Sequence, residues 1–190
     1  MKNLKILSFF TLISHLFCFA QCKKHKSPGN PVDQLPPETQ TGANTFGCLI
    51  NGQAFLPKGP SLSPILQCAY QYLNTNYSQG YFFQLSGSDR SKSTDITSVG
   101  IYTDSLNINE NVFQLGDNKP GNAYGFYSRK NLQGVNMALY TTSNLAGQLT
   151  VTRFDEINQI VSGTFWFNAV NTNGDTVHVT DGRFDMQFTK

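Results

Sequence analysis

The stretch that decides the fold is residues 162–188, which read SGTFWFNAVNTNGDTVHVTDGRFDMQF. Apolar and polar residues alternate on both sides of an Asn-Gly pair, which is typical of a β-hairpin with one buried face. A two-residue turn at this pair would leave apolar residues on both faces of the hairpin. A three-residue loop over 172–174 instead pairs Asn171 with Asp175 and gives Gly174 the left-handed conformation that such loops favour. We therefore predict the three-residue loop.

This register sorts the side chains of the hairpin into an inner and an outer face. The inner face, which we expect to be buried, carries only apolar residues: Phe165, Phe167, Ala169, Val177 and Val179. The outer face carries polar residues and one tryptophan: Thr164, Trp166, Asn168, His178 and Thr180. The alternation then changes phase, and a β-bulge at 181–182 would return the last apolar residues to the inner face: Phe184, Met186 and Phe188.

The rest of residues 44–190 repeats this pattern of short apolar runs and turns. Asn51 and Gly52 separate two apolar runs and predict a second hairpin, with a type I′ turn. Residues 147–155 alternate through their whole length. No run shows a sustained helical period, and 13% aromatic with 14% charged residues also favours strands. We expect a single antiparallel all-β domain of about ten strands, either a β-sandwich or a flattened β-barrel.

The N-terminal residues have the pattern of a bacterial lipoprotein signal peptide. Lys2 and Lys5 precede an apolar stretch at 6–20 that is too short and too interrupted for a comfortable membrane span. We expect residues 1–21 to be removed and Cys22 to be acylated, although the residues just before this cysteine depart from the usual lipobox.

The alternative is ordinary secretion with cleavage after Ala20, which would leave Cys22 as a free thiol. Cys18 leaves with the signal peptide in both cases. Acylation leaves an even pair of cysteines in the exported domain, Cys48 and Cys68, whereas ordinary secretion leaves an odd thiol. Because odd thiols are uncommon in oxidising compartments, this count favours acylation of Cys22.

We expect residues 22–43 to form the lipidated cysteine and a disordered, proline-rich tether. After Cys22 the segment holds four of the eight prolines and few large aliphatic residues, so that it cannot bury enough apolar surface to fold alone. Its basic residues, Lys23, Lys24 and Lys26, would lie beside the lipid and attract anionic headgroups, so the membrane is an expected partner. From residue 44 onward nine Lys and Arg stand against ten Asp and Glu, and no nucleic acid partner is expected.

Cys48 and Cys68 are candidates for a disulfide between the first hairpin and the strand after it. Such a bond would close a loop of about 20 residues and stabilise the fold by roughly 3 kcal/mol. The alternative is two buried thiols. A zinc site needs about four ligands, and His178 is the only histidine of the domain. We therefore expect no metal site and no cofactor.

The outer face of the C-terminal hairpin is the candidate binding site. Trp166 would lie there beside Asn168 and His178, and a ring flanked by an amide and an imidazole suits stacking on a glycan or contact with an envelope protein. The alternative is that a second sheet covers this face. We expect a non-enzymatic binding module anchored in the cell envelope, with a structural or assembly component as the alternative.

A carboxylate-dependent hydrolase is a third and less favoured function. It would rest on acidic residues in two places, Asp155 with Glu156 in an expected turn and Asp181 with Asp185 around the expected bulge. Turns select Asp for its hydrogen bonds to the backbone, which explains these residues without catalysis.

Two segments carry a resemblance to a known family: SGTFWFNAVNTNGDTVHVTDGRFDM at 162–186 and TGANTFGCLINGQAFLP at 41–57. Both are similar to a family of small predicted lipoproteins from Bacteroidetes, whose function is unknown and which therefore implies no catalytic residues. Surface-exposed lipoproteins of that group tend to carry acidic residues after the acylated cysteine. Here residues 23–26 are basic, so the resemblance implies an envelope location facing the periplasm.

Overall fold

The computed structural model describes residues 29–60, 64–74, 76–131, 133, 136–145 and 147–190. The expected signal peptide and the expected acylation site at Cys22 lie outside these residues. In the described part of the chain, regular structure consists of β-strands and one short 3₁₀ turn, η2 (Pro31–Gln34). No helix within these ranges has the length and apolarity that crossing a bilayer requires.

The described residues form 11 strands, each of which pairs antiparallel with its neighbours. In chain order the strands are β1 (Thr45–Ile50), β2 (Gln53–Phe55), β3 (Leu66–Asn74), β4 (Gln79–Lys92), β5 (Asp95–Thr103), β6 (Val112–Gln114), β7 (Ala123–Asn131), β8 (Asn136–Tyr140), β9 (Gly147–Asp155), β10 (Ile160–Val170) and β11 (Thr176–Gln187).

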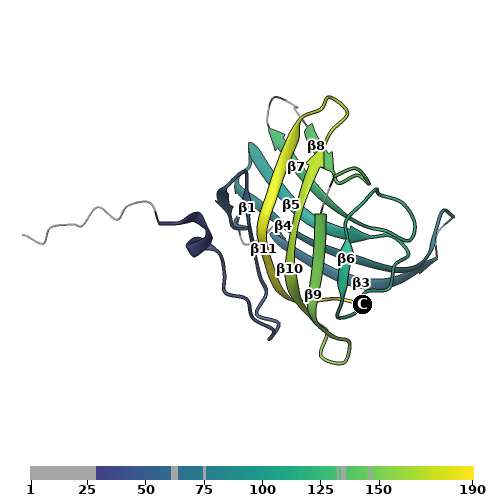
Figure 1. The fold of residues 1–190 in the computed structure, drawn as a ribbon. Coiled ribbons are helices and arrows are strands. Elements are labelled where there is room, and N and C mark those ends of the chain that lie inside the picture. Colours follow the sequence, from purple (N-terminus) through teal and green to yellow (C-terminus); the bar gives the residue numbers. More distant parts are fainter. Residues whose placement is uncertain (1–28, 61–63, 75, 132, 134–135, 146) are drawn as a thin grey trace, which may run out of the picture.

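One sheet folds over on itself to enclose the core. Its hydrogen-bonded order is β2-β1-β11-β10-β8-β7-β5-β4-β3, with a branch in which β9 pairs with the first part of β10 and β6 pairs with β9. In Figure 1, β1, β11, β10, β9 and β6 form a near layer, and β3, β4, β5 and β7 cross behind it. The predicted antiparallel all-β fold is therefore confirmed, in a form that resembles a sandwich.

The sheet is not closed into a barrel by a continuous ladder of strand pairs. Two isolated parallel bridges link its edges, one between Lys58 and Asp89 and one between Ala69 and Thr189. A single apolar core lies between the two layers, and Phe83 and Phe167 are among its largest fully buried side chains. Burying a phenylalanine stabilises a fold by about 1.5–3 kcal/mol, so each of these two side chains contributes substantially to the stability of the sandwich.

The C-terminal hairpin has the predicted register. The Asn171 N–H donates to the Asp175 carbonyl oxygen at 3.1 Å, and Gly174 has a φ of +85°. Every side chain assigned to the inner face is buried. The predicted bulge is also present, because the pairing of β10 with β11 shifts next to Asp181, which has a φ of +53°.

The first hairpin is confirmed as well, and both central residues of its turn have the positive φ angles of a type I′ turn. Asn51 has a φ of +49° and Gly52 a φ of +77°, between the paired residues Ile50 and Gln53. Asparagine and glycine tolerate this backbone conformation better than other residues, which is why the pair predicts the turn.

Part of the segment assigned to the tether is structured and packs on the outer side of β1. Leu35 is only 7% exposed. A Cβ atom at Gly47 of β1 would lie 2.7 Å from the Pro36 Cδ atom, so this segment lies directly against the strand. We call residues 35–43 the strap. The ordered domain thus begins before residue 44, where the sequence pattern placed its start, because the strap makes contacts with the sheet that its own composition does not reveal.

Candidate functional site

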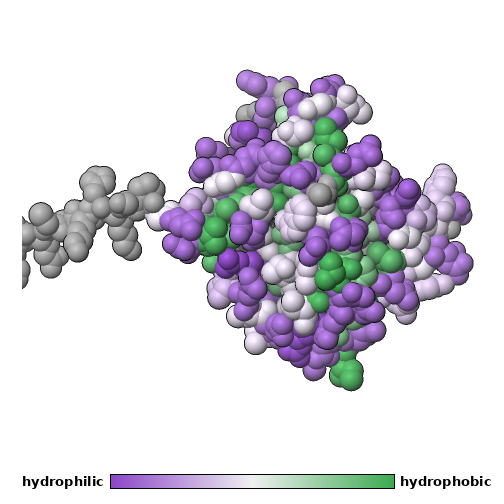
Figure 2. Space-filling model, in the orientation of Figure 1, coloured by the Kyte–Doolittle hydropathy of each residue, from purple (hydrophilic) through white to green (hydrophobic). Residues whose placement is uncertain are grey.

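A groove of about 360 Å³ lies on the outer face of the near layer, where β9, β10 and β11 are paired side by side. Its lining combines one exposed ring with amide, hydroxyl, carboxylate and guanidinium groups, among them Glu38, Gln148, Thr150, Trp166, Asp181 and Arg183. The strap supplies Glu38, and the strands supply the others. Figure 2 shows this face of the molecule as mostly polar, with small separate apolar areas and no continuous apolar patch.

Trp166 lies on the outer face, as its place in the hairpin predicts, and is 39% exposed. It stands opposite the bulge, where residues 180 and 181 of β11 face this one residue of β10. Asp181 also borders the groove and has the left-handed backbone conformation that Asp tolerates better than most residues. A second sheet does not cover the ring, so the covered-face alternative does not apply at Trp166.

Asn168 and His178 lie on the same outer face but do not line the groove. They are directly opposite each other in β10 and β11, and the His178 Nδ1 lies 2.6 Å from the Asn168 Oδ1. The backbone N–H of His178 donates to the Asn51 Oδ1 at 2.9 Å, which ties the hairpin to the β1–β2 turn. The structure thus joins two of the predicted residues as a cross-strand pair, while the groove extends from Trp166 toward β9 and the strap.

Most polar residues of the groove were not predicted as site residues, and Gln148, Arg183 and Glu38 are the three with the longest side chains. Gln148 is an outward residue of β9, and its Nε2 donates to the Thr150 Oγ1 at 3.0 Å. Arg183 follows the bulge, and its Nε lies 3.7 Å from the Glu38 Oε1. The alternation of β9 places Gln148 on the outer face, so this residue could have been predicted from the sequence. No local pattern connects the strap residue Glu38 with the C-terminal hairpin.

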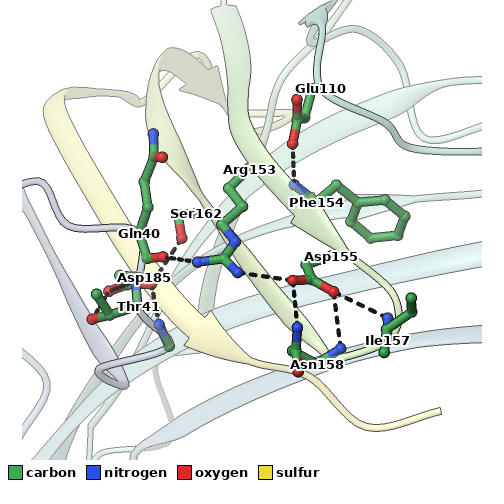
Figure 3. Close-up of polar contacts among 11 residues, drawn as sticks. Gln40, Thr41, Glu110, Arg153, Phe154, Asp155, Ile157, Asn158, Ser162 and Asp185 are labelled. Atoms are coloured by element: carbon green, nitrogen blue, oxygen red, sulfur yellow. Dashed lines mark hydrogen bonds and ion pairs between the residues drawn. The ribbon is translucent and has the colours of Figure 1, made fainter.

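A buried carboxylate fastens the strap to β11. Asp185 is 0% exposed, and its two oxygens accept six hydrogen bonds from hydroxyl groups and backbone amides. The donors on the strap are the Thr39 Oγ1 at 2.6 Å, the Thr41 N–H at 3.0 Å and Oγ1 at 3.2 Å, the Gly42 N–H at 2.7 Å and the Ala43 N–H at 3.2 Å. The sixth donor is the Ser162 Oγ of β10 at 2.7 Å. Figure 3 shows Asp185 at the meeting point of these elements.

The environment of Asp185 identifies it as an ionised structural group. Burial by itself would raise the pKa of the carboxyl, because it disfavours the charged form. The hydrogen bonds from Thr39, Thr41, Ser162 and Gly42 outweigh burial and lower the pKa well below its ordinary value. A general acid needs the opposite, a raised pKa, so this carboxylate is not in a state suited to proton donation.

Arg153 connects the strap to the β9–β10 turn. Its guanidinium donates to the Gln40 carbonyl oxygen through Nη1 and to the Asp155 Oδ2 through Nη2, the latter at 2.8 Å (Figure 3). Asp155 in turn accepts hydrogen bonds from the backbone N–H groups of Ile157 at 3.1 Å and Asn158 at 2.9 Å. Hydrogen bonds from Asn158 and Arg153 lower the pKa of Asp155. Like Asp185, this carboxylate holds backbone N–H groups in place, here those of the β9–β10 turn.

The remaining carboxylates of the hydrolase hypothesis lie apart from each other. Glu156 is 3.7 Å from the Lys190 Nζ and lines a separate, tyrosine-rich cleft. Asp181 lines the groove, and the second acidic residue there is Glu38. Neither predicted acidic pair therefore converges on one cavity. In the described ranges, no three His, Cys, Asp or Glu side chains are placed to hold a metal ion.

Cys48 and Cys68 are free thiols in the structure, so the expected disulfide between them is not formed. Cys48 on β1 and Cys68 on β3 are both buried in the core. Burial raises the pKa of both thiols. They pack as small apolar side chains, which was the alternative to the disulfide.

The fold and the groove define a class of protein, an antiparallel β-sandwich whose outer face carries a polar groove around a single tryptophan. Residues 83–186 match the domain of unknown function DUF6252. Because this match spans more than half of the chain, the protein belongs to the DUF6252 family. The matched region contains every strand residue of the groove but not the strap. No curated protein and no solved structure matches the chain.

Proposed function

We propose that this protein is a lipid-anchored module of the bacterial cell envelope that binds a glycan at the Trp166 groove without catalysing a reaction. The observation that carries the proposal is an exposed indole ring in a groove whose other side chains are mostly polar. The sheet supports the ring rigidly, because the neighbours of Trp166 along β10, Phe165 and Phe167, are both buried. Such preorganisation reduces the entropy lost on binding.

The groove offers the two kinds of contact that a sugar ring uses. The apolar C–H face of a pyranose can pack on the exposed face of Trp166. The hydroxyl groups of the sugar can donate to the carboxylate of Asp181 and accept from Gln148 and Arg183. These three residues line the groove together with Trp166. A large protein partner would be better served by an apolar interface core, and Figure 2 shows only small apolar areas on this face. These features favour a glycan over a protein.

The lipid anchor belongs to the same proposal. It comprises a signal peptide at 1–21 and an acylated Cys22, and it is supported by the apolar stretch, the cysteine count and the similarity to small Bacteroidetes lipoproteins. The basic residues at 23–26 support a module that faces the periplasm.

We expect the mature protein to carry acyl groups on Cys22, because this cysteine follows a signal-peptide core. Intact-mass spectrometry of the full chain, expressed in a bacterial host, should show a mass above that of residues 22–190 by the added lipid. Cys22→Ser should lack this mass, whereas Cys18→Ser should keep it, because Cys18 leaves with the signal peptide. A mature wild-type protein without added mass would contradict the anchor.

We expect Trp166→Ala to weaken glycan binding by about 30-fold, which corresponds to the loss of about 2 kcal/mol for a central aromatic contact. Trp166 is the only tryptophan of the chain, so its fluorescence reports on the groove alone. The full chain, purified in detergent, is titrated with soluble oligosaccharides of N-acetylglucosamine, glucose and mannose. Emission is followed for the wild type, and calorimetry compares the wild type with the variant.

Tyr72→Ala is the matched control, because Tyr72 is a 55% exposed ring that lines the separate cleft. It should bind the same oligosaccharide as well as the wild type does. Equal affinity of the wild type and Trp166→Ala would remove the groove as the binding site. Loss of binding in Tyr72→Ala alone would move the site to the other cleft.

One observation favours a second candidate, a glycoside hydrolase. Glu38 and Asp181 both line the groove, and glycosidases act through a pair of carboxylates. Glu38 is paired with Arg183, whose Nε lies 3.7 Å from the Glu38 Oε1, and a carboxylate engaged in an ion pair suits ligand binding. Chromatography of the bound oligosaccharide after prolonged incubation separates the two functions, since shorter products that disappear in Asp181→Asn would establish hydrolysis.

A further inference from the structure

The strap contributes Glu38 to the groove and is fastened to β11 by the residues that follow Glu38. Glu38 borders the groove beside Arg183, while Thr39, Thr41, Gly42 and Ala43 bind Asp185. The residue that faces the groove is thus immediately followed by the residues that hold the strap in place. Any movement of the strap away from β11 removes Glu38 from the groove.

The hydrogen bonds between the strap and Asp185 are too numerous for the transient contact of an unstructured linker. Five of the six hydrogen bonds to the buried carboxylate of Asp185 come from the strap. Hydrogen bonds to a charged acceptor are about twice as strong as neutral ones, and a buried carboxylate left without donors is costly. Asp185 and the strap are therefore energetically dependent on each other.

Two guanidinium groups extend the same attachment on either side of Asp185. The Arg183 Nη1 donates to the Pro36 carbonyl oxygen at 3.3 Å, and Arg153 donates to the Gln40 carbonyl oxygen. Arg183 lines the groove as well. This one side chain thus contacts the strap backbone and the candidate binding site, so the position of the strap bears on the position of a groove residue.

We propose that the docked strap is an integral part of the binding site, with Asp185 as its positioning residue, so that strap docking and ligand binding strengthen each other. The ligand in this inference is the one of the proposed glycan-binding function. The coupling between the strap and the groove is independent of that function. By linkage, a ligand that binds only the docked form protects the strap, and release of the strap weakens binding by the same factor. The segment between the proposed anchor and the domain then takes part in recognition.

The test loosens the strap without altering Asp185. In Thr39→Val/Thr41→Val, two hydroxyl donors to the carboxylate are lost and the backbone donors remain. Hydrogen exchange of residues 35–43, measured by mass spectrometry on the full chain, should become at least about tenfold faster. Acrylamide should quench Trp166 more strongly, because the groove loses Glu38. Thr152→Val/Thr176→Val, at two exposed strand positions, is the matched control and should change neither readout.

Two ligand measurements complete the test, with the oligosaccharide that gives the strongest fluorescence response as the probe. The strap variant should bind it more weakly, because the apparent dissociation constant rises as the inverse of the fraction of molecules whose strap is docked, by about tenfold where that fraction falls to about one tenth. Glu38→Gln should weaken binding while the exchange of 35–43 stays as in the wild type. Faster exchange with unchanged quenching of Trp166 would overturn the inference, as would unchanged exchange. If no oligosaccharide binds the wild type, the proposed function fails, and the quenching comparison still decides whether the strap forms part of the groove.

Discussion

Asp185→Asn is expected to lower the free energy of unfolding by about 3 kcal/mol, one of the two largest effects that the structure implies. Asparagine has the same shape, but its amide nitrogen donates hydrogen bonds, whereas the groups around this position are donors themselves. Thr39, Thr41 and Gly42 would then face an N–H group or lose their acceptor. For a domain of this size the melting temperature should fall by about 6–12 °C.

Thermal unfolding followed by circular dichroism measures this difference. Asp181→Asn is the matched control, because Asp181 is exposed and its positive φ is one that Asn adopts as readily. It should change the free energy of unfolding by less than about 0.5 kcal/mol. Equal stability of the two variants would show that the hydrogen bonds to Asp185 contribute little.

The stability difference between the wild type and Asp185→Asn should also depend on pH. An aspartate in an unfolded chain has a pKa of about 3.9, and the hydrogen bonds around Asp185 hold its folded pKa below that. The contribution of this carboxylate is therefore fully present above about pH 4 and is lost as the pH falls through the folded pKa. Asp155 has a lowered pKa too, but both proteins contain it, so the difference isolates Asp185. A gap that stays constant from neutral to strongly acidic pH would contradict this account.

The C-terminal hairpin is predictable from the sequence because all of its signals are local. The alternation of side chains, the Asn-Gly pair and the phase change after Thr180 lie within a few residues of the features that they specify. The structure confirms the loop, the register and the bulge at Asp181. The outward position of Trp166 follows from the same local pattern.

The pairing partner of a strand can override its own pattern, as β9 shows. The even alternation at 147–155 places Phe154 with the outward residues and Arg153 with the inward ones. In the structure, the pairing of β9 with β10 shifts between Ser162 and Gly163. As a result, Phe154 lies on the inner side of the sheet and Arg153 on the outer side. Phe154 stacks on Phe188 with ring centroids 5.5 Å apart. The shift belongs to the pair of strands, so the sequence of β9 alone does not show it.

The strap is the part of the site that sequence patterns hide most completely. Its composition is that of a tether, and its stabilising partner, Asp185, lies 142 to 146 residues further along the chain. The same distance conceals Glu38 as a groove residue. The disulfide expectation failed for a related reason, because counting cysteines in an exported protein describes its compartment and not the geometry between Cys48 and Cys68.

The second large effect is expected for Gly163→Ala, at the irregularity between β9 and β10. A Cβ atom there would lie 2.0 Å from the Thr150 carbonyl oxygen and 2.9 Å from the Phe184 Cζ. The first contact is with backbone, so that no side-chain rotation relieves it and the two strands must move apart. Overpacking of this kind costs about 3 kcal/mol, measured as a lower midpoint of urea unfolding.

Gly116→Ala is the control for the substitution itself, because its new Cβ atom would have only one neighbour, the Asn122 Nδ2 at 3.6 Å, an ordinary contact. It should stay within about 0.5 kcal/mol of the wild type. The position of Gly163 also bears on function, because the strands that must separate carry Thr150 and Trp166 on their outer faces. Folded Gly163→Ala should therefore show altered Trp166 emission and weaker oligosaccharide binding. A variant that unfolds more easily but keeps the wild-type emission would show that the groove tolerates movement of the sheet beneath it.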